Sequence, residues 1–232
     1  MKSARSNIWH VLHSGAGGAA ENMAMDQALL ENALKLGIPT LRFYGWTESA
    51  ATFGYFQKYA VVEKITLLWP LVRRPTGGGL VPHDADWTYS LAFPPPNEWY
   101  ALKAVESYER AHEWIRRAFQ KLGVETELAA FCRDCGPGQC FEGWEKFDVL
   151  WQSRKIAGAA QRRTRDGLLI QGSVQPPPVK IARADWEHAM CEVAATGWDV
   201  TWKEFQPDAA LQRRVMELSS QIYSQPAYNQ RR

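Results

Sequence analysis

Segments that predict strands and segments that predict helices alternate along this chain of 232 residues, without a linker between them. Strands and helices that intermix in this way pack around a shared core, as in mixed α/β domains. The length also fits one domain or at most two, because domains average roughly 100–200 residues. We therefore expect one mixed α/β domain that spans residues 1–232.

Two long helices are indicated by apolar residues that recur at every third or fourth position. One helix is predicted over residues 20–36 and the other over about 99–122, and a glycine follows each as a helix terminator. The last third of the chain also has helical character. In the second helix His112 belongs to the apolar stripe, which favours a histidine of the core over a catalytic one. The stripe consists of Val105, Tyr108, His112, Ile115, Phe119 and Leu122.

Strands are indicated by short runs rich in β-branched and aromatic residues, bounded by turn-forming residues. The glycine-rich segment 14–18 after the first run is typical of a strand-to-helix turn, although such a turn can also hold a phosphate. The predicted strands cover residues 8–13, 40–46, 50–56, 71–74, 87–93, 124–129, 147–152, 154–162 and 168–175.

The charged residues, 27 Lys and Arg against 25 Asp and Glu, give a formal net charge of +2. So small an excess makes no electrostatic case for nucleic acid or an anionic membrane as a partner. No apolar run approaches the roughly 18 residues of a membrane-spanning helix, and the first residues lack the apolar core of a signal peptide. Four cysteines are too few for a disulfide scaffold, so we expect a reducing, cytoplasmic location.

The string RRPTGGGLVPH at residues 73–83, the glycine-rich string, is the most informative stretch for function. Three successive glycines after a strand let a ligand approach the backbone and leave amide groups free to bind an anion or a carbonyl. A flexible hairpin connection flanked by surface arginines is the plain alternative. The string lacks the Gly-Lys-Ser/Thr of a nucleotide-binding P-loop and the spacing of a dinucleotide-binding loop. We treat it as a candidate ligand-binding loop.

The string RKIAGAAQR at residues 154–162 is predicted as a strand with a lysine on one face. Because side chains alternate along a strand, Lys155, Ala157, Ala159 and Gln161 share that face. The small alanines leave room for a substrate beside the lysine, which makes Ala157 a candidate substrate-binding residue. A solvated lysine on an edge strand is the alternative.

Three cysteines, Cys132, Cys135 and Cys140, lie within nine residues, and Cys191 stands alone. A cysteine nucleophile must be a thiolate, which nearby cations and backbone amides favour. The alternatives are a buried, inert cysteine, a disulfide within the cluster, or a zinc site completed by Cys191. Zinc sites prefer paired Cys-x-x-Cys units or histidine partners, and this chain has one such pair, so we expect no metal.

In this order along the chain, the strings RRPTGGGLVPH and RKIAGAAQRR resemble the lipoate–protein ligase and octanoyltransferase family. Two weaker similarities are AENMAMDQALLE in the first predicted helix and TLRFYGWTESAATFGYFQ in the strand pair before the glycines. The resemblance covers roughly residues 8–175. It implies the catalytic fold shared with biotin ligases, in which helices pack around a mixed sheet and an acyl-binding tunnel.

By this resemblance an essential lysine, here Lys155, contacts the acyl carbonyl. The sequence departs from the family pattern at Gln171, where a histidine is frequent, and at Pro82, and both departures bear on acyl preference. The residues that the resemblance places around the acyl group are Arg74, Thr76, Gly77, Gly78, Gly79 and His83.

The family includes two chemistries. A ligase activates lipoate with ATP and Mg²⁺, whereas an octanoyltransferase takes an acyl group from an acyl carrier protein thioester through a cysteine. Cys140, fifteen residues before Lys155, is placed as in the Gram-positive type of octanoyltransferase. Cys191 is placed roughly as in the other type but lacks its Pro-Cys-Gly surroundings. The chain also lacks room for the accessory domain that typical ligases carry after the catalytic domain.

We therefore expect a transferase that needs no cofactor. The Cys140 thiolate would attack the carrier thioester, and Lys155 would stabilise the resulting oxyanion. The acceptor would be a lysine of a lipoyl domain, in a glycine cleavage H protein or a dehydrogenase acyltransferase subunit. An ATP-dependent ligase and a non-catalytic acyl-binding module are the alternatives.

Overall fold

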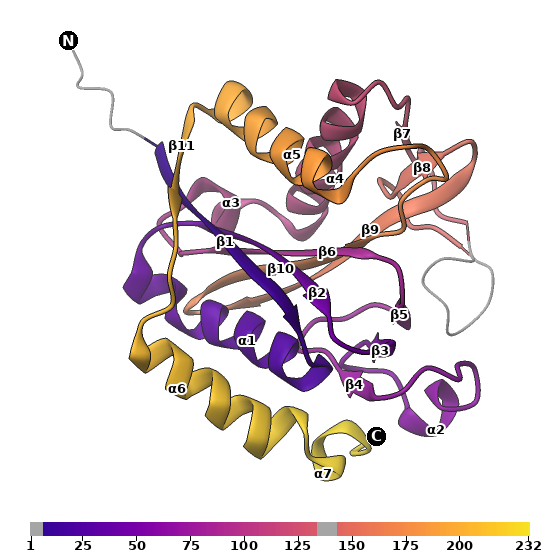
Figure 1. Ribbon diagram of the computed structural model, residues 1–232, viewed down its shortest axis with the longest axis vertical. Helices are drawn as coiled ribbons and strands as arrows, with labels where there is room; N and C mark the ends of the chain where they lie inside the picture. Colours follow the sequence, from indigo (N-terminus) through magenta and orange to yellow (C-terminus); the bar gives the residue numbers. More distant parts are fainter. Residues whose placement is uncertain (1–6, 134–142) are drawn as a thin grey trace.

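The computed structural model describes residues 7–133 and 143–232. Within these ranges an eight-stranded mixed sheet runs through the middle of the molecule (Figure 1). Its strands are β1 (Asn7–Gly17), β2 (Thr40–Trp46), β6 (Trp87–Phe93), β7 (Glu127–Leu128), β8 (Val149–Trp151), β9 (Arg154–Thr164), β10 (Gly167–Val174) and β11 (Val200–Glu204). They follow the order β11-β1-β2-β6-β10-β9-β8-β7. The pairs that β1 makes with β11 and β2 are parallel, and the others are antiparallel.

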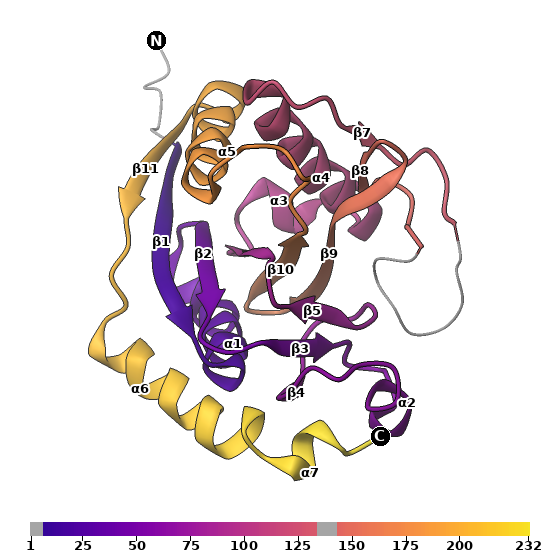
Figure 2. The same cartoon turned by 45° about the vertical axis from the view of Figure 1, so that its right-hand side comes forward.

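The remaining strands of the described residues form a second, smaller sheet. In it β3 (Ala50–Phe53) pairs in parallel with β4 (Leu71–Arg73) and antiparallel with β5 (Val81–His83). The short helix α2 (Tyr59–Val62) lies in the connection from β3 to β4 (Figure 2). The glycine-rich string therefore leaves one strand of the smaller sheet and enters another.

Helices cover both faces of the large sheet, as Figures 1 and 2 show. On one face lie α1 (Ala19–Leu36) and α6 (Ala209–Leu218), and on the other lie α4 (Ala104–Lys121) and α5 (Arg183–Trp198). The remaining helical segments of the described residues are short: α3 (Glu98–Ala101), η1 (Ser219–Tyr223) and α7 (Pro226–Asn229).

Two hydrophobic clusters hold these helices to the sheet. Under α4 and α5, the ring of Trp9 packs edge-on against Phe93 and Trp99, with centroids 5.4 and 6.3 Å apart. Under α1 and α6, buried Leu29 and Leu211 belong to a second cluster. Each large apolar side chain that is fully buried contributes about 1.5–3 kcal/mol, so the two clusters fix the layers.

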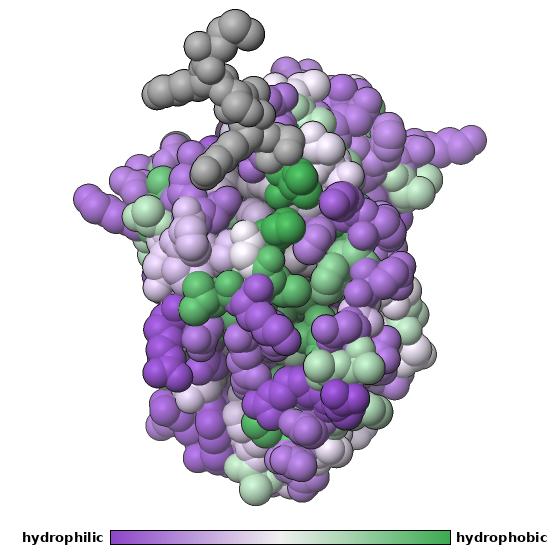
Figure 3. Space-filling view, turned by 90° about the vertical axis from the view of Figure 1, so that its left-hand side faces the viewer, coloured by the Kyte–Doolittle hydropathy of each residue, from purple (hydrophilic) through white to green (hydrophobic). Residues whose placement is uncertain are grey.

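Polar residues dominate the face of the molecule that Figure 3 presents, where hydrophobic residues form a narrow band. Among the described residues, no helix combines the length and the apolar character that crossing a membrane requires.

The structure confirms the mixed α/β class and corrects the helix predicted over 99–122. The backbones of Leu102 and Lys103 are extended there, so that α3 ends and α4 begins. The backbone N–H of Lys103 donates to the Glu106 carboxylate at 2.8 Å and thereby caps the new helix. Val105 follows this break and is 63% exposed, whereas His112 is fully buried in the stripe as predicted.

Several strands also differ from the prediction: β5 was not predicted, and β7 is shorter than the strand predicted over 124–129. The first strand continues to Gly17, because an irregularity between His13 and Ala16 shifts the pairing while β1 stays paired with β2. The segment 14–17 is therefore strand instead of turn. The helical prediction for the last third missed β11, which pairs with β1 from the opposite end of the chain.

Candidate active site

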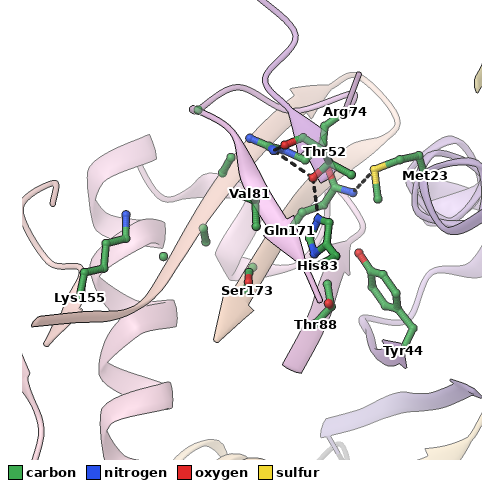
Figure 4. A pocket seen from close by; sticks show the side chains of 15 residues that line it. Met23, Tyr44, Thr52, Arg74, Val81, His83, Thr88, Lys155, Gln171 and Ser173 are labelled. Atoms are coloured by element: carbon green, nitrogen blue, oxygen red, sulfur yellow. Dashed lines mark hydrogen bonds between the residues drawn. The ribbon is translucent and has the colours of Figure 1, made fainter. Parts of the chain in front are cut away.

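A pocket lies where residues of both sheets and of α1 meet (Figure 4). Arg74, Gly78 and His83 of the glycine-rich string line it together with Lys155, a candidate site residue far from them in the sequence. The structure thus brings the glycine-rich string and the lysine strand to one cavity.

The glycine-rich string forms one wall of this pocket and lies very close to β3. Gly78 has a φ of 85°, a left-handed conformation that glycine adopts without strain. A side chain at Gly54, just after β3, would place its Cβ 1.9 Å from the carbonyl oxygen of Gly78. Both positions therefore require glycine, although only Gly78 of the two was predicted as a site residue.

Arg74 holds the glycine-rich string from its buried side. Its guanidinium donates to the carbonyl oxygens of Gly77 and Gly79 at 2.7 and 2.8 Å, and to that of Thr52 at 2.9 Å. These bonds fix the loop's carbonyl groups to β3. Arg74 therefore shapes the wall of the pocket as well as lining it.

His83 belongs to a buried chain of hydrogen bonds. Its Nε2 lies 2.7 Å from the Thr52 hydroxyl and its Nδ1 lies 2.9 Å from Oδ2 of Asp86. The ring of Trp46 stacks on the imidazole at 3.8 Å. Burial lowers the pKa of His83, although Asp86 acts in the opposite direction. We infer a neutral imidazole that donates through Nδ1 to Asp86 and accepts from Thr52 through Nε2.

Thr76 is connected to α1 through Gln171. The Thr76 hydroxyl donates to Oε1 of Gln171 at 2.8 Å, and Nε2 of Gln171 donates to Asp26 at 2.7 Å. Asp26 is fully buried and also pairs with Arg42 at 2.7 Å. The glutamine that departs from the family pattern thus links the glycine-rich string to the core and also lines the pocket, whereas Thr76, Gly77 and Gly79 are not among the lining residues.

Lys155 lies at one end of the pocket (Figure 4) and pairs with a buried carboxylate. Its Nζ is 2.7 Å from Oδ2 of Asp148, and the two side chains are 6% and 0% exposed. Asp148 also accepts from the Tyr108 hydroxyl at 2.5 Å and from the backbone N–H of Glu145 at 2.7 Å. These contacts fix Asp148, and Asp148 in turn orients the ammonium group of Lys155.

Neither Asp148 nor Tyr108 was predicted as a site residue from the sequence. A single acidic residue before the apolar β8 has no distinctive spacing. Two neighbouring strands were predicted over residues 147–152 and 154–162, however, and their pairing could have indicated an acidic residue near Lys155. In the structure Leu150 of β8 pairs with Lys155 of β9, which brings Asp148 near the lysine. Burial and the charge of Asp148 raise the pKa of Tyr108, so its hydroxyl remains a proton donor at neutral pH.

The small residues after Lys155 do not share one face. The pairing between β8 and β9 shifts by one residue beside Val149, and such a bulge interrupts the alternation of side chains. Ala157 is fully buried in the hydrophobic core and lies outside the pocket lining, whereas Ala159 lines the pocket. Gly158 gives Lys155 room, because a Cβ there would lie 2.7 Å from the lysine Cε. The structure thus places Ala159 at the cavity instead of Ala157.

Cys140, the predicted nucleophile, lies in the segment 134–142, outside the residues that the structure describes. Cys191 lies in α5, where burial, reinforced by nearby glutamates, raises the pKa of its thiol to about 12. Such a thiol carries almost no thiolate at neutral pH, so the structure disfavours Cys191 as a nucleophile.

The cysteine cluster proposed as an alternative zinc site falls partly in the same segment, since Cys135 also lies outside the described residues. Cys132 is exposed, and its Sγ lies 3.3 Å from a carboxylate oxygen of Glu145. Within residues 7–133 and 143–232, no group of three or more His, Cys, Asp or Glu side chains is placed to hold a metal ion.

Residues 18–175 match the family described as the lipoyl protein ligase A/B catalytic domain. The chain belongs to this family. The match includes α1, the glycine-rich string and Lys155, and it confirms the family predicted from the sequence.

Proteins named octanoyltransferase LipM are similar to this chain. The protein of Carboxydothermus hydrogenoformans is 34% identical over 174 residues, which cover 72% of this chain and 64% of that protein. The Oceanobacillus iheyensis protein is 39% identical, with coverages of 72% and 63%. The Bacillus subtilis protein is 32% identical, with coverages of 73% and 66%. The matched part thus spans slightly less than two thirds of the length of these relatives.

Solved structures of lipoate–protein ligases share the fold. A lipoate–protein ligase A bound with ATP has a TM-score of 0.77 and 19% identity, covering 96% of this chain and 98% of that one. A bipartite lipoate protein ligase from Thermoplasma acidophilum has a TM-score of 0.73 and 18% identity, covering 96% of each chain. At these identities the likeness concerns the fold, a mixed sheet with packed helices.

Proposed function

We propose that this protein transfers an octanoyl or lipoyl group from an acyl carrier protein thioester to a lysine of a lipoyl domain. The proposal rests on the pocket in which Lys155, oriented by the buried Asp148, shares a cavity with the glycine-rich string. A fixed cation at the end of a cavity suits a carbonyl group that becomes an oxyanion during acyl transfer. The activity in the names of the relatives supports the same reaction.

The reaction consists of two acyl transfers through Cys140. In the first, the Cys140 thiolate adds to the thioester carbonyl, the bond to the carrier sulfur breaks, and the carrier thiolate takes up a proton. In the second, the acceptor amine adds to the new thioester, the bond to Cys140 breaks, and the amine loses a proton. Lys155 stabilises the oxyanion in both steps, and one such donor contributes roughly 2.7–4 kcal/mol.

This route needs no cofactor, because the conversion of a thioester into an amide is downhill. ATP and Mg²⁺ belong to the alternative, a ligase that forms an acyl adenylate, and the names of the curated relatives favour the transferase. We also place the reaction in the cytoplasm, a reducing compartment in which the Cys140 thiol persists.

Two parallel reactions test the proposal. In one, a lipoyl domain is mixed with octanoyl carrier protein, and in the other with octanoate or lipoate, ATP and Mg²⁺. We expect an octanoylated lipoyl domain in the first reaction, lost in Cys140→Ala and retained in Cys191→Ala. Product in the second reaction alone would establish the ligase, and product in neither would leave the non-catalytic acyl-binding module.

A further inference from the structure

Three arginines gather around one tyrosine ring at the surface. The guanidinium carbons of Arg162, Arg231 and Arg232 lie 5.5, 4.3 and 5.7 Å from the centre of the Tyr55 ring. A hydrogen bond from Arg231, together with the surrounding positive charge, lowers the pKa of Tyr55. We call these four residues the basic patch. They come from β9, from the end of the chain and from the segment after β3, so the fold brings them together.

The arginines of the basic patch differ from other surface arginines in their ion pairing. In the part of the chain that the structure describes, no ion pair includes Arg162, Arg231 or Arg232, although arginines elsewhere on the surface do pair, as Arg214 does with Glu31. Cations that cluster at one site create a positive potential, which attracts an anionic partner and accelerates its association.

The basic patch borders the outer side of the glycine-rich string. The backbone N–H of Tyr55 donates to the carbonyl oxygen of Thr76 at 2.9 Å, and Arg162 donates to that of Pro75 at 3.4 Å. Beneath the patch, the buried Arg73 donates to the carbonyl oxygen of Tyr55 at 2.8 Å. The patch is therefore held in place against the loop whose inner side lines the pocket.

An exposed aromatic side chain lies beside the basic patch. Phe56 is 72% exposed, its ring packs edge-on against Tyr55 at 5.1 Å, and the guanidinium of Arg232 lies 5.4 Å from it. Aromatic residues and arginine are the residue types that dominate the binding energy of protein interfaces. The surface thus offers an acidic protein both an exposed apolar side chain to pack against and positive charges that match its own negative charges.

We propose that the basic patch and Phe56 form the docking surface for the acyl carrier protein that donates the acyl group, through an acidic face of that carrier. This inference rests on the proposed function. It assigns the surface of this protein that recognises the acyl donor.

The position of the glycine-rich string relative to Lys155 favours the donor over the acceptor as the partner. An acceptor lysine reaches the acyl carbonyl with its own side chain, so its domain must lie directly at the reacting end of the pocket. A carrier holds its thioester on a long pantetheine arm, joined through an anionic phosphodiester, so its folded body can rest farther away. Figure 4 shows Lys155 apart from Arg74 and Thr52, the residues that hold the string bordered by the patch. The basic patch therefore suits the donor.

The test compares a carrier donor with a small donor. Octanoyl carrier protein and octanoyl pantetheine are given to the wild type and to the double variant Arg231→Glu/Arg232→Glu. Arg213→Glu is the matched control, because Arg213 is an exposed arginine of α6 outside the patch. Kinetics are measured at low and high salt, and binding of the carrier is measured separately by fluorescence anisotropy.

We expect the double variant to raise the KM for the carrier and the Kd of its binding by about tenfold at low salt, with kcat nearly unchanged. The KM for octanoyl pantetheine stays constant, and added salt weakens carrier binding by the wild type more than by the variant. Phe56→Ala weakens carrier binding in the same direction, and Arg213→Glu does not.

Equal carrier binding by the wild type and the double variant would overturn the docking surface. So would an equal rise in KM for both donors, or a rise confined to the lipoyl-domain acceptor. The binding measurement separates the two proposals, because a wild type that binds the carrier through these arginines but transfers nothing keeps the docking surface and removes the proposed function.

Discussion

The ion pair between Lys155 and Asp148 is the residue-scale feature on which the proposed chemistry depends. Both side chains are almost completely buried, and Asp148 receives further hydrogen bonds from Tyr108 and from the backbone of Glu145. A buried charge that loses its partner is strongly destabilising, whereas the pair together is close to neutral for stability. The pair therefore positions the lysine ammonium more than it stabilises the fold.

A double-mutant cycle tests this arrangement. We predict that Asp148→Ala lowers the free energy of unfolding by about 3–5 kcal/mol, because it leaves the Lys155 ammonium buried without its carboxylate. Lys155→Met also destabilises, and the double variant loses clearly less than the sum of the two. Urea denaturation measures all four proteins. The exposed pair Lys121–Glu192, 3.4 Å apart, is the control, with a coupling of about 0.2–1 kcal/mol. Additive losses at Lys155 and Asp148 would contradict the pairing.

Two buried histidines make stability depend on pH. Burial lowers the pKa values of His83 and His112 below the ordinary 6.5, so the folded protein binds protons more weakly than the unfolded chain. Their contribution is complete above pH 6.5 and is lost as the pH falls from 6.5 towards the folded-state pKa. The unfolded chain takes up protons in that range and the folded protein does not.

We predict that His112→Gln reduces the loss of unfolding free energy between neutral and mildly acidic pH, because it removes a buried group that binds protons more weakly in the folded protein. Urea denaturation on both sides of the ordinary histidine pKa gives this difference. The matched control variant is His188→Gln, because the side chain of His188 is 76% exposed. A pH dependence in His112→Gln as steep as in the wild type would contradict the role of the buried imidazole.

At the scale of elements, the sequence predicted most strands of the central sheet because each is a run of apolar and β-branched residues. It could not predict that 99–122 divides into two helices, since the break at Leu102 and Lys103 contains neither glycine nor proline. It also missed β11, whose partner β1 lies at the other end of the chain. Local periodicity indicates which face of a helix or strand is buried. The pairing of strands that are far apart in the sequence, and the positions of bulges, depend on the tertiary structure.

The contact between β3 and the glycine-rich string is an element-scale prediction. Gly54→Ala would bring a Cβ to 1.9 Å from the carbonyl oxygen of Gly78, and backbone on both sides must move to relieve this. We predict a folded protein whose acyl transfer falls at least about tenfold, because the pocket wall shifts. Gly197→Ala in α5 is the control, since a Cβ there meets no atom within 4 Å. Unchanged transfer by Gly54→Ala would contradict the close contact.

At the scale of the whole molecule, the fold joins sequence signals that are far apart. The motifs alone predicted the family and a common site for Arg74, His83 and Lys155, and the structure places all three at one pocket. They could not predict the supporting partners Asp148, Asp86 and Asp26, because a single buried carboxylate has no sequence signature. The misplacement of Ala157 has a similar cause, a bulge in β9 that only the pairing with β8 creates. That residues 1–232 form a single catalytic domain stays a prediction.

The proposed acyl transfer passes through a thioester on Cys140. The most direct measurement is the intact mass of the protein after mixing with octanoyl carrier protein in the absence of an acceptor, followed by peptide mapping. We predict that the mass increases by one octanoyl group on the peptide that contains Cys140, and that adding a lipoyl domain removes it. Cys140→Ala stays unmodified, while Cys191→Ala is modified like the wild type. An enzyme that octanoylates the lipoyl domain without ever carrying this mass, or that carries it in Cys140→Ala, would contradict the account.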